Sequence, residues 1–121
     1  MNILVCEDNV LTLRTVEFDM KRAGFEVFKA TDGDEGIRIL DEQVIDLVIT
    51  DINMPYTKGL ELVLHVNEKF NKKIPVIIIS SFTLKETKDH ARELGAKGYL
   101  TKPFDLDDLV ELVNSFTPEN G

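Results

Sequence analysis

Short apolar runs alternate along the chain with segments in which apolar residues recur at helical spacing. Nearly continuous apolar runs of this length are typical of strands buried on both faces of a sheet. They predict strands at residues 2–6, 25–29, 45–50, 74–80 and 97–101. The helical spacing predicts helices at residues 10–23, 35–41, 60–70, 85–94 and 106–116. The least apolar run, 25–29, fits a sheet edge, and the most apolar, 74–80, fits a central strand.

Five strand-then-helix units of this length predict an α/β fold with a parallel sheet and helices on both faces. Such sheets place their functional sites beyond the carboxyl ends of the strands, at the point where the strand order reverses. We therefore expect the functional residues among those that directly follow each predicted strand.

Composition narrows the class of protein. The chain has 121 residues and a net charge of −8, so we expect a single domain over residues 1–121 with a frayed tail at 117–121. No apolar run approaches the roughly 18 residues of a membrane span. The acidic balance argues against direct nucleic-acid binding, and Cys6 alone cannot form an internal disulfide. We expect a cytoplasmic protein that contacts neither nucleic acid nor membrane.

Polar residues follow four of the five predicted strands. Glu7 and Asp8 follow the first, Asp51 the third, Ser80 ends the fourth and Lys102 follows the fifth. If the first and third strands are neighbours, three carboxylates converge, and they need a compensating cation. Carboxylate oxygens without a paired histidine or cysteine favour Mg²⁺ over zinc.

A metal, a carboxylate nucleophile, a lysine and a hydroxyl together predict a phosphoryl-transfer site. Asp51 would attack phosphorus in line and form an acyl phosphate, while Mg²⁺ and Lys102 neutralise the transferring oxygens. Ser80 would donate a hydrogen bond to a phosphoryl oxygen, and its movement would report the modification to the surface.

Five motifs occur in order, each at its expected strand end. They are ILVCEDN at 3–9, DGDEG at 32–36, DINMP at 51–55 with Gly59, IPVIIIS at 74–80 and GAKGYLTKPF at 95–104. With these motifs the sequence resembles the receiver domain of two-component response regulators over residues 2–116. The resemblance implies a flavodoxin-like, doubly wound (βα)5 fold with strand order 2-1-3-4-5.

The resemblance also implies roles for the site residues. Asp51 takes the phosphoacceptor position, and Glu7 and Asp8 hold Mg²⁺ directly or through water. Asn53 gives its backbone carbonyl to the metal, and Lys102 binds the phosphoryl group. The Lys102–Pro103 bond resembles the cis peptide of the family.

A switch and its partners follow from the same resemblance. Ser80 and Tyr99 occupy the switch positions, and a histidine kinase or histidine phosphotransfer protein supplies the phosphoryl group. The output partner binds the face made by residues 85–94, 97–101 and 106–116. The last helix is purely acidic over 105–113, which argues against a dimer built on basic–acidic pairs, and we expect a monomer or a weak phosphorylation-linked dimer.

Two residues depart from the commonest pattern of the family. Ser81 stands where a small alanine is usual, so it can compete with Ser80 for hydrogen bonds. Phe82 is bulky and apolar, and we hypothesise that it screens the acyl phosphate from water and slows hydrolysis.

Three other functions are weighed against the phosphorylation switch. An aspartyl-phosphate hydrolase of the haloacid-dehalogenase type would place a general-acid aspartate at position 53, where this chain has Asn53. In an FMN-binding module, Glu7 and Asp8 would repel the phosphate. A phosphorylation-independent interaction module remains as the alternative. We therefore expect no enzyme with a metabolic substrate, only self-catalysed phosphotransfer to Asp51 and slow self-catalysed dephosphorylation.

Overall fold

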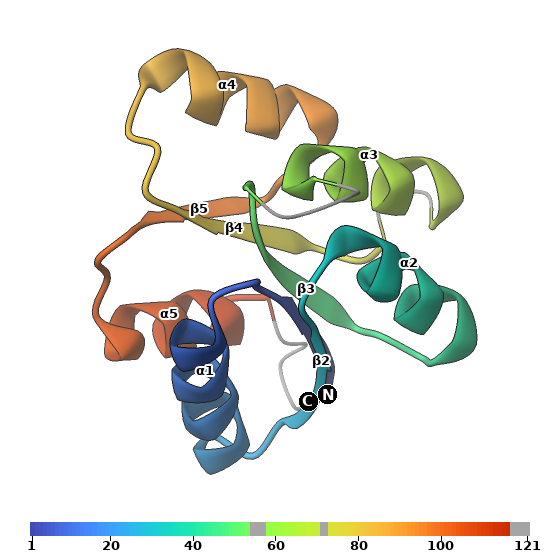
Figure 1. Ribbon diagram of the computed structural model, residues 1–121, viewed down its shortest axis with the longest axis vertical. Helices are drawn as coiled ribbons and strands as arrows, with labels where there is room; N and C mark the ends of the chain where they lie inside the picture. The colour runs from blue at the N-terminus through green and yellow to red at the C-terminus, as the bar shows by residue number, and fades with distance from the viewer. Residues whose placement is uncertain (54–57, 71–72, 117–121) are drawn as a thin grey trace.

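The computed structural model describes residues 1–53, 58–70 and 73–116. Strands and helices alternate throughout this part of the chain (Figure 1). The strands are β1 (Asn2–Cys6), β2 (Glu26–Ala30), β3 (Leu47–Asp51), β4 (Val76–Ser80) and β5 (Gly98–Thr101). The helices are α1 (Val10–Arg22), α2 (Gly33–Glu42), α3 (Gly59–Lys69), α4 (Lys85–Leu94) and α5 (Leu106–Asn114). The predicted tail at 117–121 lies outside the described residues.

All the strands pair in parallel, in the order β2-β1-β3-β4-β5. The sequence-based prediction of a flavodoxin-like, doubly wound sheet is therefore confirmed. β2 lies at an edge, as its weaker hydrophobicity indicated. The central strand is β3, whereas β4, which was expected there, lies between β3 and β5. Both are buried at every position, so hydrophobicity alone does not separate two interior strands.

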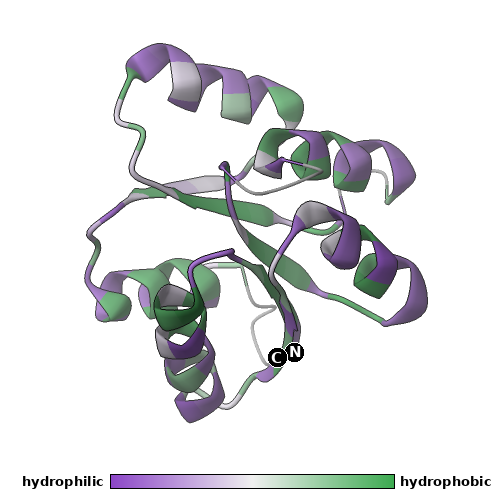
Figure 2. Cartoon of the chain, in the orientation of Figure 1, coloured by the Kyte–Doolittle hydropathy of each residue, from purple (hydrophilic) through white to green (hydrophobic). Residues whose placement is uncertain are grey.

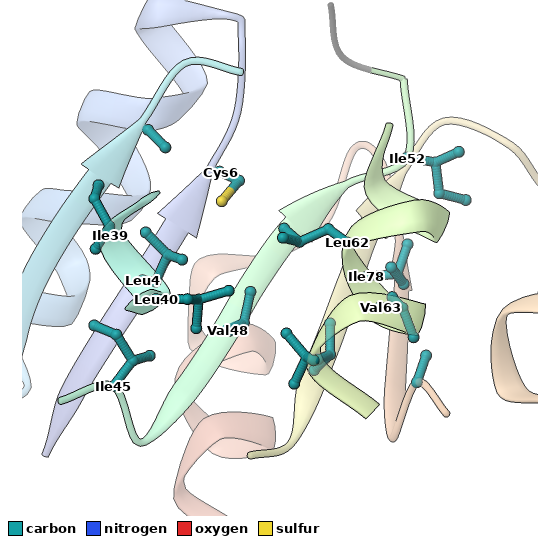
Figure 3. Packing of buried hydrophobic residues seen from close by; sticks show 14 of the residues in the cluster. Leu4, Cys6, Ile39, Leu40, Ile45, Val48, Ile52, Leu62, Val63 and Ile78 are labelled. Carbon is teal, nitrogen blue, oxygen red and sulfur yellow. The ribbon is translucent and has the colours of Figure 1, made fainter. Parts of the chain in front are cut away.

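Helices cover both faces of the sheet, with α1 and α5 on one face and α2, α3 and α4 on the other (Figure 1). Alternate residues of each strand belong to the hydrophobic layers on the two faces of the sheet, because successive side chains of a strand point to opposite faces. In β1, Ile3 and Val5 belong to the α1/α5 layer, while Leu4 and Cys6 belong to the other. Figure 3 shows this second layer from close by, and Figure 2 shows hydrophobic residues along β3 and β4.

Local chemistry sets the helix ends. The Asn9 side chain accepts a hydrogen bond from the Thr12 N–H and caps α1. α2 begins at Gly33, two residues before the predicted start, because the Asp32 carboxylate accepts from the Glu35 N–H and caps the helix there. No helix in the described ranges has the length and hydrophobicity needed to cross a membrane.

Candidate functional site

The carboxyl ends of β1, β3 and β5 bring the predicted site residues together. Glu7 directly follows β1, Asp51 is the last residue of β3, and Lys102 directly follows β5. These strands run parallel in one sheet, so their ends lie at the same edge (Figure 1). Side chains separated by up to 95 residues in sequence thereby come within hydrogen-bond distance.

Lys102 links the two buried carboxylates of the site. Its Nζ donates to Asp51 Oδ2 at 2.7 Å, and it also donates to Glu7 Oε1. The Lys102 N–H donates to the Ser80 carbonyl at 2.7 Å, which fixes the backbone from which the side chain extends. Burial lowers the pKa of the Lys102 ammonium, but the two carboxylate partners outweigh burial and raise this pKa above its usual value. The lysine is therefore a fixed positive charge in the site.

Glu7 places its carboxyl group in a region without solvent. Its side chain is fully buried, and burial raises the pKa of its carboxyl to about 7. Lys102 lowers this pKa and Asp51 raises it, but desolvation has the largest effect. The second oxygen, Oε2, is buried and has no hydrogen-bond partner among the described residues. A buried carboxylate oxygen without a partner is costly, so its surroundings favour a bound cation.

A third carboxylate completes an acidic cluster at the surface. One carboxylate oxygen from each of Glu7, Asp8 and Asp51 lies within 4.8 Å of the others. Asp8 is exposed, whereas the other two residues are buried, so the cluster opens to solvent on the Asp8 side. Three hard oxygen donors with one open side suit Mg²⁺, which keeps several of its waters when protein-bound. The cluster that was predicted from the strand ends is therefore present, and its donors fit this metal.

Asp51 is held in place by the backbone as well as by Lys102. The Asn53 N–H donates to Asp51 Oδ1 at 3.1 Å, so each carboxylate oxygen of Asp51 has a hydrogen-bond donor. The predicted metal contact of Asn53 uses its carbonyl instead, and that contact stays a prediction. Residues 54–57, which continue the DINMP motif, lie outside the described part of the chain.

Gly59 allows α3 to start directly against the end of β3. Its N–H donates to the Ile52 carbonyl at 2.9 Å. A Cβ at this position would lie 2.0 Å from the backbone oxygen of Asp51. Any larger residue would push α3 away from the strand end that carries Asp51. The motif search singled out this glycine, but its physical reason appears only in the structure.

Ser80 and Tyr99 meet through the backbone of one residue, Phe82. The Ser80 hydroxyl oxygen accepts from the Phe82 N–H at 3.0 Å, and the Tyr99 hydroxyl donates to the Phe82 carbonyl at 2.9 Å. Ser80 is fully buried at the end of β4, whereas Phe82 has 44% of its surface exposed. Sequence reasoning named all three residues but missed this bridge, which uses peptide groups that every residue possesses. Ser81, the predicted competitor of Ser80, is exposed.

The Lys102–Pro103 peptide is cis, as the resemblance implied. Of the predicted site residues, the structure gathers Glu7, Asp8, Asp51 and Lys102 into one cluster. Ser80 lies at the end of the neighbouring strand β4.

Comparison with known proteins identifies the family. The family model of the response regulator receiver domain matches residues 3–114. The chain belongs to this family. The match runs from the second residue of β1 to the last residue of α5.

Individual relatives extend this finding. The chain is 34% identical over 114 residues to the transcriptional regulatory protein CrdR of Helicobacter pylori, covering 94% of this chain and 54% of CrdR. It is 37% identical over 109 residues to the aerobic respiration control protein ArcA of Escherichia coli, covering 90% of this chain and 45% of ArcA. The chain thus spans about half the length of the curated relatives it matches.

A solved structure of the response regulator TrrA of Thermotoga maritima superposes with a TM-score of 0.86 at 27% identity. The match covers 96% of this chain and 98% of that one, and TrrA was solved in complex with Mg²⁺–BeF.

Proposed function

We propose that this receiver domain is a phosphorylation-dependent switch of a two-component phosphorelay, with Asp51 as the phosphoacceptor. Glu7, Asp8 and Asp51, together with the Asn53 carbonyl, would hold Mg²⁺. Membership of the receiver family supports signalling in general. The acidic cluster and the Mg²⁺–BeF complex of TrrA support the metal.

The observation that carries the proposal is the pair of hydrogen bonds that orients Asp51. Lys102 Nζ lies at 2.7 Å from one carboxylate oxygen and the Asn53 N–H at 3.1 Å from the other. Preorganised donors of this kind stabilise charge that develops during reaction and need little rearrangement. Asp51 is thus held at the open edge of the sheet, where a phosphoryl donor can approach.

In the proposed reaction, a carboxylate oxygen of Asp51 attacks the phosphorus of a phosphohistidine on the donor protein. The new O–P bond forms as the P–N bond breaks, and the electron pair of that bond stays on the imidazole. Lys102 provides a positive charge to the phosphoryl oxygens throughout. Bound Mg²⁺ would supply further neutralisation of phosphoryl charge. The donor would be a histidine kinase or a histidine phosphotransfer protein, and the chain itself would catalyse this transfer and the later loss of phosphate.

Transmission to the surface would use the Phe82 bridge. A phosphoryl group on Asp51 adds a charge of about −1.5 to −2 and strong acceptor oxygens. The Ser80 hydroxyl would donate to one of these oxygens, which alters the position of the oxygen that now accepts from Phe82. Since Tyr99 holds the carbonyl of the same residue, the change reaches the face made by α4, β5 and α5. An output partner that prefers the altered face would read the modification.

Intact-mass spectrometry with acetyl phosphate and Mg²⁺ tests the proposal. The chain should gain one phosphoryl group, and the gain should be lost with EDTA or in Asp51→Asn. The matched control is Asp107→Asn, which makes the same change at an exposed aspartate of α5 and should leave the gain intact. A wild-type chain that binds Mg²⁺ without forming an adduct would contradict the proposal and favour a phosphorylation-independent interaction module.

A further inference from the structure

A hollow of about 450 Å³ lies between α4 and the start of β5, outside the phosphoacceptor site. The charged residues that line it are Lys88 and Arg92 of α4 and Lys97 of the loop before β5, all of them cations. The chain as a whole carries a charge of −8, so the hollow is a positively charged area on a negatively charged molecule. A positive area of this kind indicates a site for an anionic ligand.

Two residues of the lining are apolar and buried. Ala91 and Ala96, here called the floor, are 1% and 8% exposed, and Tyr99 also lines the hollow. Lys88 Nζ lies 5.6 Å from the centroid of this ring, a cation–π distance that keeps the ammonium beside the hollow. The site therefore combines an apolar floor with a cationic rim, and a matching ligand needs an apolar group surrounded by negative charges.

Neighbouring acidic residues leave most of this positive charge available. Asp89 of α4 accepts from Lys85 at 2.8 Å and lies 3.6 Å from Arg92 Nη1. The Arg92 side chain is still 77% exposed, and Lys97 is exposed as well. Glu93 is also exposed on α4, but it is not among the lining residues. One carboxylate is thus shared between two cations, while Lys88 and Lys97 face the hollow.

The arrangement favours carboxylates over a compact phosphate. Phosphate sites typically use the N–H groups of a helix N-terminus, whereas this hollow adjoins the C-terminal half of α4, which ends at Leu94. The three cations come from α4 and from the loop before β5, and they line the hollow together with the apolar pair Ala91 and Ala96. Several separate acids that flank an apolar side chain meet this pattern, as in an acidic peptide.

We infer that the hollow binds an acidic segment of a partner protein, with its carboxylates against Lys88, Arg92 and Lys97 and an apolar side chain on the floor. The inference deepens the proposed function and rests on it, because it names the chemistry of the output partner. Tyr99 lines the hollow and also holds the Phe82 carbonyl. Tyr99 therefore connects the hollow with Ser80. A peptide bound in the hollow should change the position of Ser80, and a movement of Ser80 should change the affinity of the hollow for the peptide.

Fluorescence anisotropy with defined peptides tests the inference on the full chain. The probes are labelled 12-residue peptides of leucine and glutamate, the same peptides with glutamine for glutamate, and inorganic pyrophosphate as a competitor. The acidic peptide should bind about tenfold tighter than the glutamine peptide, and added salt should weaken it. Equal binding of both peptides would overturn the inference, as would displacement by pyrophosphate at a lower concentration than unlabelled acidic peptide.

Two matched variants locate the binding. Lys88→Gln/Arg92→Gln/Lys97→Gln should weaken the acidic peptide about tenfold or more. Lys21→Gln/Lys29→Gln/Arg38→Gln removes the same charge from α1, β2 and α2 and should have little effect. Equal losses in the two variants would show only a general charge effect and would overturn the assignment, as would unchanged binding in the first variant. Circular dichroism checks that both remain folded.

The phosphorylation assay on the same samples separates the two proposals. A wild-type chain that gains no phosphoryl group but binds the acidic peptide through Lys88, Arg92 and Lys97 would refute the proposed function and leave the acidic site standing. A chain that is phosphorylated on Asp51 but shows no preference for the acidic peptide would refute the acidic site alone.

Discussion

The ammonium of Lys102 lies 2.7 Å from the carboxylate of Asp51 and joins strands β5 and β3 across the mouth of the site. The same ammonium donates to the fully buried Glu7. This single positive charge contacts two carboxylates, and Asp8 adds a third, so the site keeps a negative balance that a divalent cation can offset.

Replacement of Lys102 should affect phosphorylation strongly. Lys102→Gln removes the positive charge opposite the phosphoryl oxygens, so the rate with acetyl phosphate should fall by about 10²-fold. Time-resolved intact mass at saturating Mg²⁺ measures this rate. Lys85→Gln, at a side chain that is 87% exposed on α4, is the control and should retain the rate of the wild type. Equal rates for the two variants would contradict a role for Lys102 in the transfer.

The raised pKa of Glu7 predicts a pH-dependent stability in EDTA. The folded chain holds the Glu7 proton up to about pH 7, whereas the unfolded chain releases it near the ordinary glutamate pKa of 4.5. The free energy of unfolding should therefore fall as the pH rises from about 4.5 to 7, by an amount on the order of 2 kcal/mol. Urea denaturation at several pH values measures the fall.

Two changes should reduce this dependence on pH. Glu7→Gln removes the titrating group, so its stability should decline less over the same range. Mg²⁺ should raise the stability of the wild type most at the alkaline end, where the carboxylate is charged. An identical pH profile in Glu7→Gln and the wild type would show that Glu7 is not the group responsible.

Gly59 and Gly24 offer a comparison between a steric and a conformational requirement. Gly59→Ala places a Cβ against the Asp51 backbone oxygen and should cost about 2–3 kcal/mol of unfolding free energy. Gly24→Ala meets no atom within 4 Å, and its φ of +95° should cost about 1 kcal/mol. Thermal or urea denaturation distinguishes the two. Only Gly59→Ala should also slow phosphorylation, because it displaces the end of β3.

Phe82 should control the lifetime of the acyl phosphate. Phe82→Glu replaces an apolar side chain that follows Ser80 with a group that can orient water, so hydrolysis should accelerate roughly tenfold or more. Loss of the phosphoryl group after removal of acetyl phosphate, followed by intact mass, gives the rate. Leu84→Glu makes a similar change at an exposed residue of the same loop and should not alter it. Unchanged decay in Phe82→Glu would refute the screening role.

The hydrophobic pattern predicted the fold because the interior strands β1, β3 and β4 are apolar enough to be buried on both faces. It also led to the candidate site, since parallel strands gather their carboxyl ends at one edge and the search needed only the residues that follow them. Glu7, Asp51 and Lys102 meet there although they are far apart in sequence. Hydrophobicity alone did not distinguish the places of β3 and β4, because every residue of both strands is buried, and their order followed from the resemblance to the receiver family.

Features that depend on how distant elements pack together could not be predicted from the sequence. The bridge from Ser80 to Tyr99 uses the N–H and the carbonyl of Phe82, which are backbone groups without any sequence signature. The cationic hollow forms only because α4 packs beside the start of β5. This packing brings together Lys88 and Lys97, which belong to different elements. Neither arrangement follows from hydrophobic period or motif spacing.

α4 has one fully buried residue, Ala91, whereas α1 has three. Leu94 adds a partly buried contact at its end. Lifting the helix would expose one methyl group and part of one leucine, at a cost on the order of 2 kcal/mol. It would also break the hydrogen bond from Asn67 Nδ2 to the Leu94 carbonyl, worth about 1 kcal/mol. A single hydrogen bond to a charged group contributes about 1.5–3 kcal/mol. Ser80 and Lys102, by closing on a phosphoryl group, would therefore supply enough free energy to shift α4 while both core layers stay intact.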